Sequence, residues 1–205
     1  MKKSFYITTP IYYPSAKPHM GHAYSSISAD VIARFKRLDG FDVKFLTGTD
    51  EHGQKIQKSA IKENLSPIEF CDKISKVFFD LTKKLNLSNT DFIRTTEKRH
   101  SETVQRLWKI LEENNKIYLS KYSGWYSVSD EAFYSEDEIE TAQGKKTCSA
   151  TGSSVEWVEE ESFFFKLSEY QDLLLNFYEK NPDFIQPASR KNEVISFVKS
   201  GLKDL

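Results

Sequence analysis

The order of patterns at the start of the chain constrains its fold more than any other feature of the sequence. Residues 4–9 are rich in aromatic and β-branched side chains, as a buried strand is, and two prolines follow closely. Residues 23–38 are periodic like a long helix, and an Asp-Gly pair stops it before a second strand at residues 42–47, which ends at Gly48. Strand, loop, helix and strand predict one βαβ unit with two parallel strands.

Two loops follow these strands, and both are expected at the carboxyl ends of the strands, where open α/β sheets bind ligands. The first loop ends in His-Met-Gly-His at residues 19–22, directly before the helix. Backbone N–H groups at a helix start lack internal partners and the helix dipole is positive there, which suits a polyphosphate. Gly21 has no Cβ and would let a flat ligand such as a purine lie against the backbone. A plain polar turn is the alternative, and the βαβ context favours the anion site.

The second loop reads Thr-Gly-Thr-Asp-Glu-His-Gly-Gln at residues 47–54. Together with His-Met-Gly-His, this run resembles the methionyl-tRNA synthetases, class I enzymes whose signature is His-Ile-Gly-His. The leucyl, isoleucyl, valyl and cysteinyl enzymes share the first motif but resemble this chain poorly around Asp50. The resemblance covers essentially the whole chain, including residues 124–126 and 159–165. It implies an α/β fold: the first half of a doubly wound, Rossmann-like parallel sheet that carries a small β-containing connective-peptide insert.

The resemblance also implies a reaction, in which methionine is activated with ATP to methionyl-adenylate and then transferred to the acceptor end of tRNA(Met). The methionine carboxylate attacks the α-phosphate and pyrophosphate leaves, so catalysis rests on positioning and charge neutralisation and needs no protein nucleophile. His19 and His22 would be the catalytic residues, donating hydrogen bonds to phosphate. They would bind ATP together with Gly21 and Tyr12, and Mg²⁺ would be held largely by ATP and water.

The second loop would hold methionine. The resemblance places the ammonium group at Asp50, and the alternative for Asp50 is a solvated loop acid or a cap for the following helix. Ile11 and Tyr13 would line the thioether pocket, with the Ile11 backbone N–H facing sulfur, although plain core packing is a close alternative for Tyr13. Glu51 and His52 belong to the signature, and we expect them to support the loop.

Further helices are predicted over residues 67–86, 96–114, 168–178 and 192–200, and a third strand over residues 91–94. Ser66 and Ser168 are each expected to open a helix with a capping box. Apolar stripes on the two earlier helices are interpreted as core; they comprise Ile68, Ile74, Phe78, Leu81 and Leu85, and Val104, Leu107, Trp108 and Leu111.

The predicted division has three parts: a nucleotide-binding half at residues 1–117, the connective-peptide insert at 118–160, and a helical return segment at 161–205.

In many members of the family the insert binds zinc through two Cys-x-x-Cys pairs. The matching positions here are Ser127, Asp130, Cys148 and Thr151, so three of the four thiolates are missing. Because a structural zinc site needs a closed tetrahedral set of Cys or His ligands, we predict no zinc and no protein-held metal. The insert is instead expected to be held by aromatic packing of Trp125, Tyr126, Phe133, Tyr134 and Trp157.

Charge and cysteine content exclude several other classes. The net charge of −1 gives no global basic footprint, so tRNA contacts would have to come from elsewhere. No apolar run approaches the roughly 18 residues that a membrane span needs, and the first strand begins too early for a signal peptide. Two well-separated cysteines form no disulfide framework. We therefore expect a cytoplasmic protein without membrane contact. We also expect a monomer.

The family's Lys-Met-Ser-Lys-Ser loop, its Trp-containing pocket segment and its anticodon-binding domain do not occur in these 205 residues. We therefore expect an N-terminal fragment, inactive alone, whose first strand is an open sheet edge. A non-catalytic ATP- or partner-binding fragment is one alternative. Another His-x-Gly-His nucleotidyltransferase, such as a cytidylyltransferase or a pantothenate synthetase relative, is disfavoured by the Asp50 signature and the aromatic insert.

Overall fold

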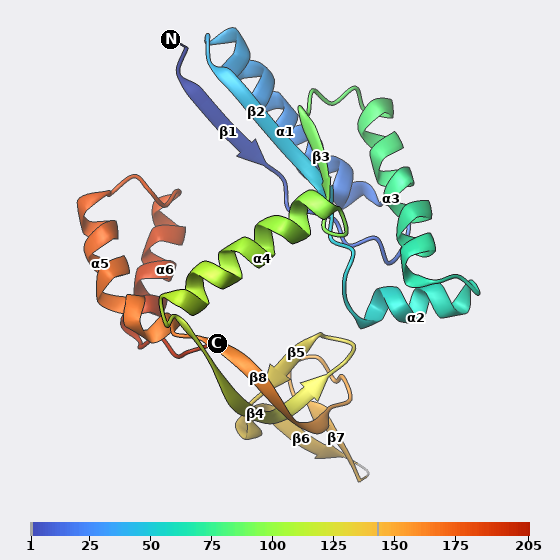
Figure 1. Cartoon of the computed structure of the whole chain (residues 1–205), viewed down its shortest axis with the longest axis vertical. Coiled ribbons are helices and arrows are strands. Elements are labelled where there is room, and N and C mark those ends of the chain that lie inside the picture. The colour runs from blue at the N-terminus through green and yellow to red at the C-terminus, as the bar shows by residue number, and fades with distance from the viewer. Residues whose placement is uncertain (1, 143) are drawn as a thin grey trace. The chain divides into compact units, whose positions relative to one another are not determined.

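The predicted βαβ unit is present at the start of the chain (Figure 1). The structure is a computed structural model that describes residues 2–142 and 144–205. Strand β1 (Ser4–Thr8) leads through the proline-containing loop into α1 (Met20–Leu38), and β2 (Asp42–Thr49) returns parallel to β1. Helix α1 begins three residues before the predicted start at residue 23, because the motif itself forms its first turn.

A third strand completes the sheet, in the order β1-β2-β3. Strand β3 (Asp91–Arg94) has the predicted bounds and pairs in parallel with the end of β2. Within the described chain β1 is a sheet edge, as expected for the first half of a doubly wound fold. The predicted end of β2 at Gly48 is wrong, since the strand continues to Thr49. A Cβ on Gly48 would lie 2.0 Å from the backbone oxygen of Ile93, so glycine permits the close approach of β3.

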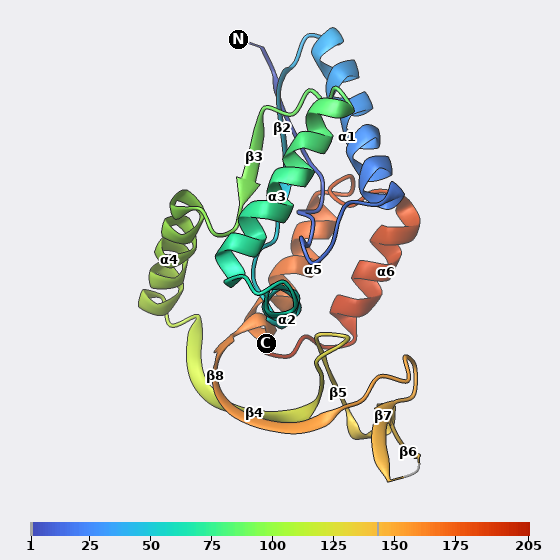
Figure 2. The ribbon, with the colours of Figure 1, turned by 90° about the vertical axis from the view of Figure 1, so that its right-hand side faces the viewer.

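Two helices follow β2, and α3 lies in front of the strands in Figure 2. They are α2 (Gln54–Lys62) and α3 (Pro67–Lys84), and α3 begins with the predicted capping box of Ser66 and Glu69. Ile74 and Phe78 of α3 are buried as predicted. The core assignment of Ile68 is wrong, because this residue lies in the first turn and is 49% exposed.

The sheet and its helices enclose two clusters of buried side chains. One lies between α1 and β2, and the other joins the loop before α1 to α2 and α3. The first cluster contains Ala29, Ala33, Val43 and Phe45; the second contains Tyr12, Ile56, Ala60, Phe70, Cys71, Ile74 and Phe78.

Helix α4 (Lys98–Glu113) contains the boundary between two structural units, Met1–Gln105 and Arg106–Leu205. None of its residues is buried, so the prediction that its apolar stripe forms core is wrong. Trp108 packs edge-on against Phe163 at 5.2 Å between ring centroids and remains 40% exposed. Periodicity establishes that a helix is amphipathic, but it does not establish that another element covers the apolar face.

The second unit contains the β-containing insert. Three strands form an antiparallel sheet in the order β5-β4-β8, and a separate hairpin and a short 3₁₀ turn lie between β5 and β8. The sheet strands are β4 (Ile117–Ser127), β5 (Ala132–Tyr134) and β8 (Glu156–Phe165); the turn is η1 (Glu136–Glu138) and the hairpin is β6 (Ile139–Ala142) with β7 (Lys145–Cys148). The rings of Trp125 and Trp157, opposite each other on β4 and β8, lie 5.1 Å apart.

After β8 come a 3₁₀ turn, η2 (Leu167–Tyr170), and two helices, α5 (Gln171–Lys180) and α6 (Ala188–Lys199). The predicted capping box at Ser168 is wrong. Ser168 lies inside η2, where its hydroxyl donates to the Asp204 carboxylate at 2.6 Å, and α5 begins three residues later without a side-chain cap. Among the described residues, no helix has both the length and the apolar character needed to cross a membrane.

Candidate active site

The two histidines of the motif cap α1 reciprocally. The backbone N–H of Gly21 donates to Nδ1 of His19 at 3.1 Å, and the backbone N–H of His19 donates to Nδ1 of His22 at 3.0 Å. The pair therefore forms the arrangement of a capping box, with His19 as the N-cap and His22 three residues later. The two ring centroids lie 3.8 Å apart.

This arrangement determines where each imidazole carries its proton. Because both Nδ1 atoms accept hydrogen bonds, each neutral ring is protonated at Nε2. Burial of the His22 ring, and then the nearby charge of His19, lower the pKa of His22 below its ordinary value of 6.5. The helix start therefore presents two Nε2–H donors at the positive end of the helix dipole, and such donors suit a phosphate oxygen.

Gly21 leaves the space that the His19 ring occupies in the cap. A Cβ at this position would lie 2.9 Å from Cε1 of His19, closer than such contacts are found, so any side chain here would displace the ring. The role predicted for Gly21, beneath a purine, stays a prediction.

Tyr12 supports the motif from within the protein. Its hydroxyl lies 2.7 Å from Oγ of Ser26 and donates to the backbone oxygen of His22 at 3.2 Å. Its ring is stacked on Phe78 at 5.6 Å and meets the His22 ring edge-on at 4.8 Å. Contact between Tyr12 and ATP remains a prediction, whereas these contacts show Tyr12 orienting His22.

The two candidate loops meet at the carboxyl end of β2. The backbone N–H of Tyr12 donates to the oxygen of Gly48 at 2.9 Å, and the N–H of Asp50 donates to the oxygen of Tyr12 at 2.9 Å. The residues predicted for the thioether pocket flank Tyr12: Ile11 is 37% exposed, and Tyr13 is partly buried against the second cluster. The structure thus brings the predicted methionine residues and the histidine motif to one edge of the sheet.

Asp50 is half-buried, and its carboxylate accepts no hydrogen bond from any residue that the structure describes. The alternative that Asp50 caps the next helix is wrong. Helix α2 has Gly53 as its N-cap, with φ of 108° and no side-chain cap. The carboxylate is therefore free to accept hydrogen bonds from a cationic ligand.

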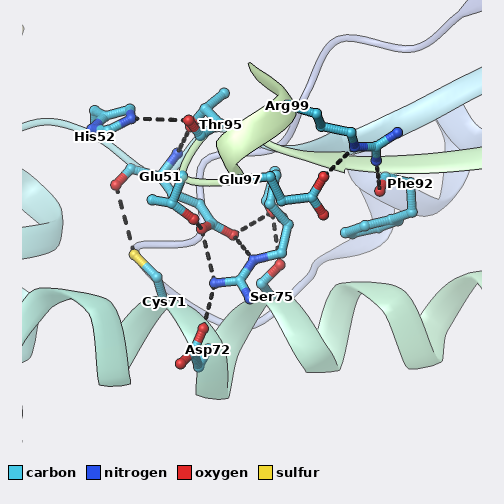
Figure 3. Close-up of polar contacts among 12 residues, drawn as sticks. Glu51, His52, Cys71, Asp72, Ser75, Phe92, Thr95, Glu97 and Arg99 are labelled. Carbon is cyan, nitrogen blue, oxygen red and sulfur yellow. Dashed lines mark hydrogen bonds and ion pairs between the residues drawn. The ribbon is translucent and has the colours of Figure 1, made fainter. Parts of the chain in front are cut away.

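Its neighbour Glu51 is buried and fully paired (Figure 3). Oε1 accepts from Thr49 Oγ1 and Arg94 Nε, both at 2.7 Å. Oε2 accepts from Arg94 Nη2 at 2.9 Å and from Thr96 Oγ1 at 2.5 Å. Burial by itself would raise the pKa of Glu51, but the hydrogen bonds from Arg94, Thr96 and Thr49 outweigh it and hold the pKa below its usual value.

Several residues of this region were given no site role from the sequence, among them Gly48, Ser26, Arg94, Thr49 and Thr96. Ser26 lies four residues after His22 on the same helix, where i,i+4 spacing places it on the same face. Arg94 ends the third predicted strand and so reaches the same sheet edge as Asp50. The sequence shows where Ser26 and Arg94 lie on their elements. It does not show which residues they contact.

The four positions of the insert that match the zinc-binding Cys-x-x-Cys pairs do not form a metal-binding donor set. The Asp130 carboxylate accepts from Thr151 Oγ1 at 2.6 Å, from Ser153 Oγ at 2.7 Å and from the Tyr134 hydroxyl at 2.9 Å. Ser127 Oγ accepts from the Asp130 backbone N–H at 3.2 Å. No group of three His, Cys, Asp or Glu side chains in the described ranges could hold a metal ion, so this set does not fit structural zinc.

Comparisons with known proteins agree with one another. A family model described as tRNA synthetases class I (M) matches residues 5–205. A methionine–tRNA ligase of Rickettsia felis is 60% identical over 205 residues, covering 100% of this chain and 39% of the relative. One of Rhizobium meliloti is 59% identical over 201 residues, covering 98% of this chain and 39% of the relative.

Solved structures give the same result. Mycobacterium tuberculosis methionyl-tRNA synthetase in complex with methionyl-adenylate matches with a TM-score of 0.92 and 50% identity, over 99% of this chain and 40% of that one. The apo form of that enzyme matches with a TM-score of 0.77 and 47% identity, over 100% of this chain and 39% of that one. The chain thus spans about two fifths of the length of the relatives it matches.

Proposed function

Because the chain belongs to the class I tRNA synthetases of the methionine type, we propose that it supplies the ATP- and methionine-binding part of a methionine–tRNA ligase. One observation carries the proposal. The Tyr12 side chain contacts His22 at the start of α1, and the Tyr12 backbone oxygen accepts from the Asp50 N–H. Two imidazole N–H donors and a carboxylate without a partner among the described residues therefore lie together at the carboxyl end of β2.

In the proposed reaction the methionine carboxylate attacks the α-phosphate of ATP and pyrophosphate leaves. The Nε2–H groups of His19 and His22 donate to phosphate oxygens, and these bonds strengthen as negative charge develops. Tyr12 holds the His22 backbone and ring in place for this contact, and Gly21 leaves space for adenine. Mg²⁺, when bound through phosphate oxygens and water, supplies charge neutralisation.

Methionine is proposed to bind beside the histidines. Its ammonium group donates to the Asp50 carboxylate, and its side chain contacts Ile11 and Tyr13. The opposite charges of ligand and carboxylate make these hydrogen bonds charge-assisted and short. Transfer of the methionyl group to the acceptor end of tRNA(Met) is proposed for the longer protein, since the chain spans only 39% of the R. felis relative.

The test is a chimera in which residues 1–205 of this chain replace the matching part of the R. felis ligase. We expect methionine-dependent exchange of pyrophosphate into ATP, and none from the 205-residue chain alone. In the chimera, Asp50→Ala should weaken methionine binding by about 30-fold or more with ATP affinity nearly unchanged, because a desolvated ammonium loses its partner. A folded chimera without exchange would refute the proposed function. Normal methionine binding by Asp50→Ala would refute the role of Asp50.

We propose that residues 118–160 form a zinc-free connective peptide between the 1–117 and 161–205 segments, and that the protein is a cytoplasmic monomer without membrane contact. Hydrogen bonds to Asp130 support the zinc-free state, since they use the carboxylate that a metal would need. Elemental analysis should find well under one zinc per chain, and a chelator should leave the thermal midpoint unchanged. Stoichiometric zinc that is lost together with the fold would contradict this.

A further inference from the structure

Glu51 lies next to the proposed methionine ligand but cannot itself bind substrate. Its side chain is 0% exposed, and both oxygens already accept two hydrogen bonds each. A buried carboxylate is costly unless it is paired and hydrogen-bonded, and here a bidentate arginine and two hydroxyls provide the pairing. Neither solubility nor the formation of a loop requires a buried, fully paired carboxylate. This indicates that Glu51 positions the residues around it.

The surrounding bonds hold the backbone on both sides of Asp50. The N–H of Glu51 donates to Thr95 Oγ1 at 2.8 Å, and the N–H of Thr95 donates to the oxygen of Thr49 at 3.2 Å. Nε2 of His52 lies 3.3 Å from the oxygen of Thr95. Figure 3 shows Glu51, His52 and Thr95 gathered in this way above α3.

Helix α3 contributes further contacts from its first half. Sγ of Cys71 lies 3.7 Å from the oxygen of Glu51, and Oγ of Ser75 lies 2.7 Å from Thr49 Oγ1. Burial, and then the charge of Glu51, raise the pKa of Cys71 to about 11, so the thiol is a neutral donor at this place.

Asp50 is thereby held between two anchors. Its own N–H donates to Tyr12, while the residues on either side of it are bonded to the end of β3. Side chains alternate along an extended segment, so with Thr49 and Glu51 directed to the Arg94 side, Asp50 is directed away from it. The carboxylate is consequently positioned by its neighbours and left without a protein partner among the described residues.

We propose that Glu51 is a positioning residue which, through Arg94, Thr95 and Thr96, fixes the loop from Thr49 to His52 and so sets the place of Asp50 against the methionine ammonium group. This inference rests on the proposed function of Asp50. It assigns separate roles to two adjacent acids: Asp50 contacts the substrate and Glu51 orients Asp50.

The test uses Glu51→Gln in the R. felis chimera. The amide has nearly the size of the carboxylate but cannot accept both bonds from Arg94, so the loop loses its fixed geometry while the fold is retained. We expect KM for methionine to rise by about 10-fold to 100-fold, since displacement by about 1 Å has effects of that order, while KM for ATP changes less than about 2-fold.

The matched control is Asp72→Asn. Asp72 also pairs with Arg94, at 2.6 Å, but its side chain is 58% exposed and does not touch the loop. It should change neither KM by more than about 2-fold, because exposed ion pairs contribute little. If Glu51→Gln does not fold, Thr96→Val removes a single donor to Glu51 and should raise KM for methionine alone by a smaller factor.

The outcomes separate this inference from the proposed function. Loss of methionine-dependent exchange in the unsubstituted chimera would be a failure of the proposed function. If that chimera is active and Glu51→Gln lowers the thermal midpoint without changing KM for methionine, Glu51 is structural only and the inference is wrong. Equal increases in both KM values would also overturn it.

Discussion

Helices α1 and α3 start with the same reciprocal arrangement built from different residues. In α3, the backbone N–H of Glu69 donates to Ser66 Oγ at 3.3 Å and the N–H of Ser66 donates to the Glu69 carboxylate at 2.9 Å. In α1, imidazole nitrogens of His19 and His22 take the places of hydroxyl and carboxylate. An imidazole that accepts at Nδ1 keeps an N–H at Nε2 for a ligand, whereas the serine and glutamate of α3 complete their roles within the helix.

The difference agrees with the proposal that the start of α1, and not that of α3, binds a ligand. Serine is among the best N-cap residues, and its hydroxyl here also donates to Glu69 at 2.6 Å. Histidine is not a preferred N-cap. Helix α1 is instead stabilised by tertiary packing of Ala29 and Ala33 in the first buried cluster. The stability of α1 therefore does not rest on its N-cap alone, which is compatible with the proposed ligand contact of its first turn.

The largest expected difference in activity comes from truncating the third residue of each helix, which is His22 in α1 and Glu69 in α3. In the chimera, His22→Ala should slow pyrophosphate exchange by about 100-fold to 1,000-fold, the usual loss for one donor to developing charge. Glu69→Ala should leave the exchange rate within about 2-fold, since it removes only a helix cap. Steady-state kinetics on both variants, with thermal midpoints recorded, would separate the roles. Equal rate losses would show that the two boxes are not functionally different.

The second residue of each helix gives the next comparison. Gly21→Ala places a Cβ 2.9 Å from the His19 ring, so the ring must move from its capping position. We expect exchange to slow by about 10-fold or more, as for small displacements of positioned groups. Ile68→Ala is the matched change in α3, where the side chain is exposed, and it should alter neither rate nor fold. Full activity of Gly21→Ala would mean that the His19 position is unimportant.

Lowering the pH should destabilise the capped starts of α1 and α3 at different pH values. The pKa of His22 is lowered from 6.5, so the unfolded chain binds the proton more readily, and the stability contribution is lost as pH falls below about 6.5. The pKa of Glu69 is lowered from 4.5 by its bonds to Ser66, so its contribution persists until below pH 4.5. Between pH 7 and 5, the protection of backbone amides against hydrogen exchange, relative to their intrinsic exchange rates at each pH, should fall at the start of α1 and not at the start of α3. A simultaneous loss of protection at both starts would contradict the tautomer assignment.

These comparisons also show what the sequence could and could not predict. Aromatic and β-branched runs and the Ser-Pro-x-Glu box are local signals, so the sheet strands and the start of α3 were found from them. The histidine cap was missed because histidine is not a usual cap residue, and Ser168 was assigned one wrongly because Asp204, a distant residue, competes for its hydroxyl. Tertiary contacts decided both cases.

The candidate site also contains features that the sequence could predict and features that it could not. Family motifs and the position of strand ends predicted which residues would gather at the sheet edge, and Tyr12 and Asp50 do meet there. The four bonds to Glu51 involve residues 43 and more positions away as well as Thr49, so no local pattern could give them. The spacing of His19 and His22 was visible, but their tautomers depend on backbone geometry.

The smallest expected effect on activity tests whether α3 contributes only stability. Ser66→Ala removes the N-cap acceptor and should lower the free energy of unfolding by about 1 kcal/mol, the typical cost of a lost N-cap. Exchange in the chimera should be unchanged, because α3 reaches Glu51 and Thr49 through Cys71 and Ser75, which lie beyond the first turn, and fraying is confined to the first turn. Denaturant titration gives the first quantity and steady-state kinetics the second. A rise in KM for methionine would instead show that the start of α3 helps to hold the Asp50 loop, and the contrast between a binding helix start and a purely structural one would no longer hold.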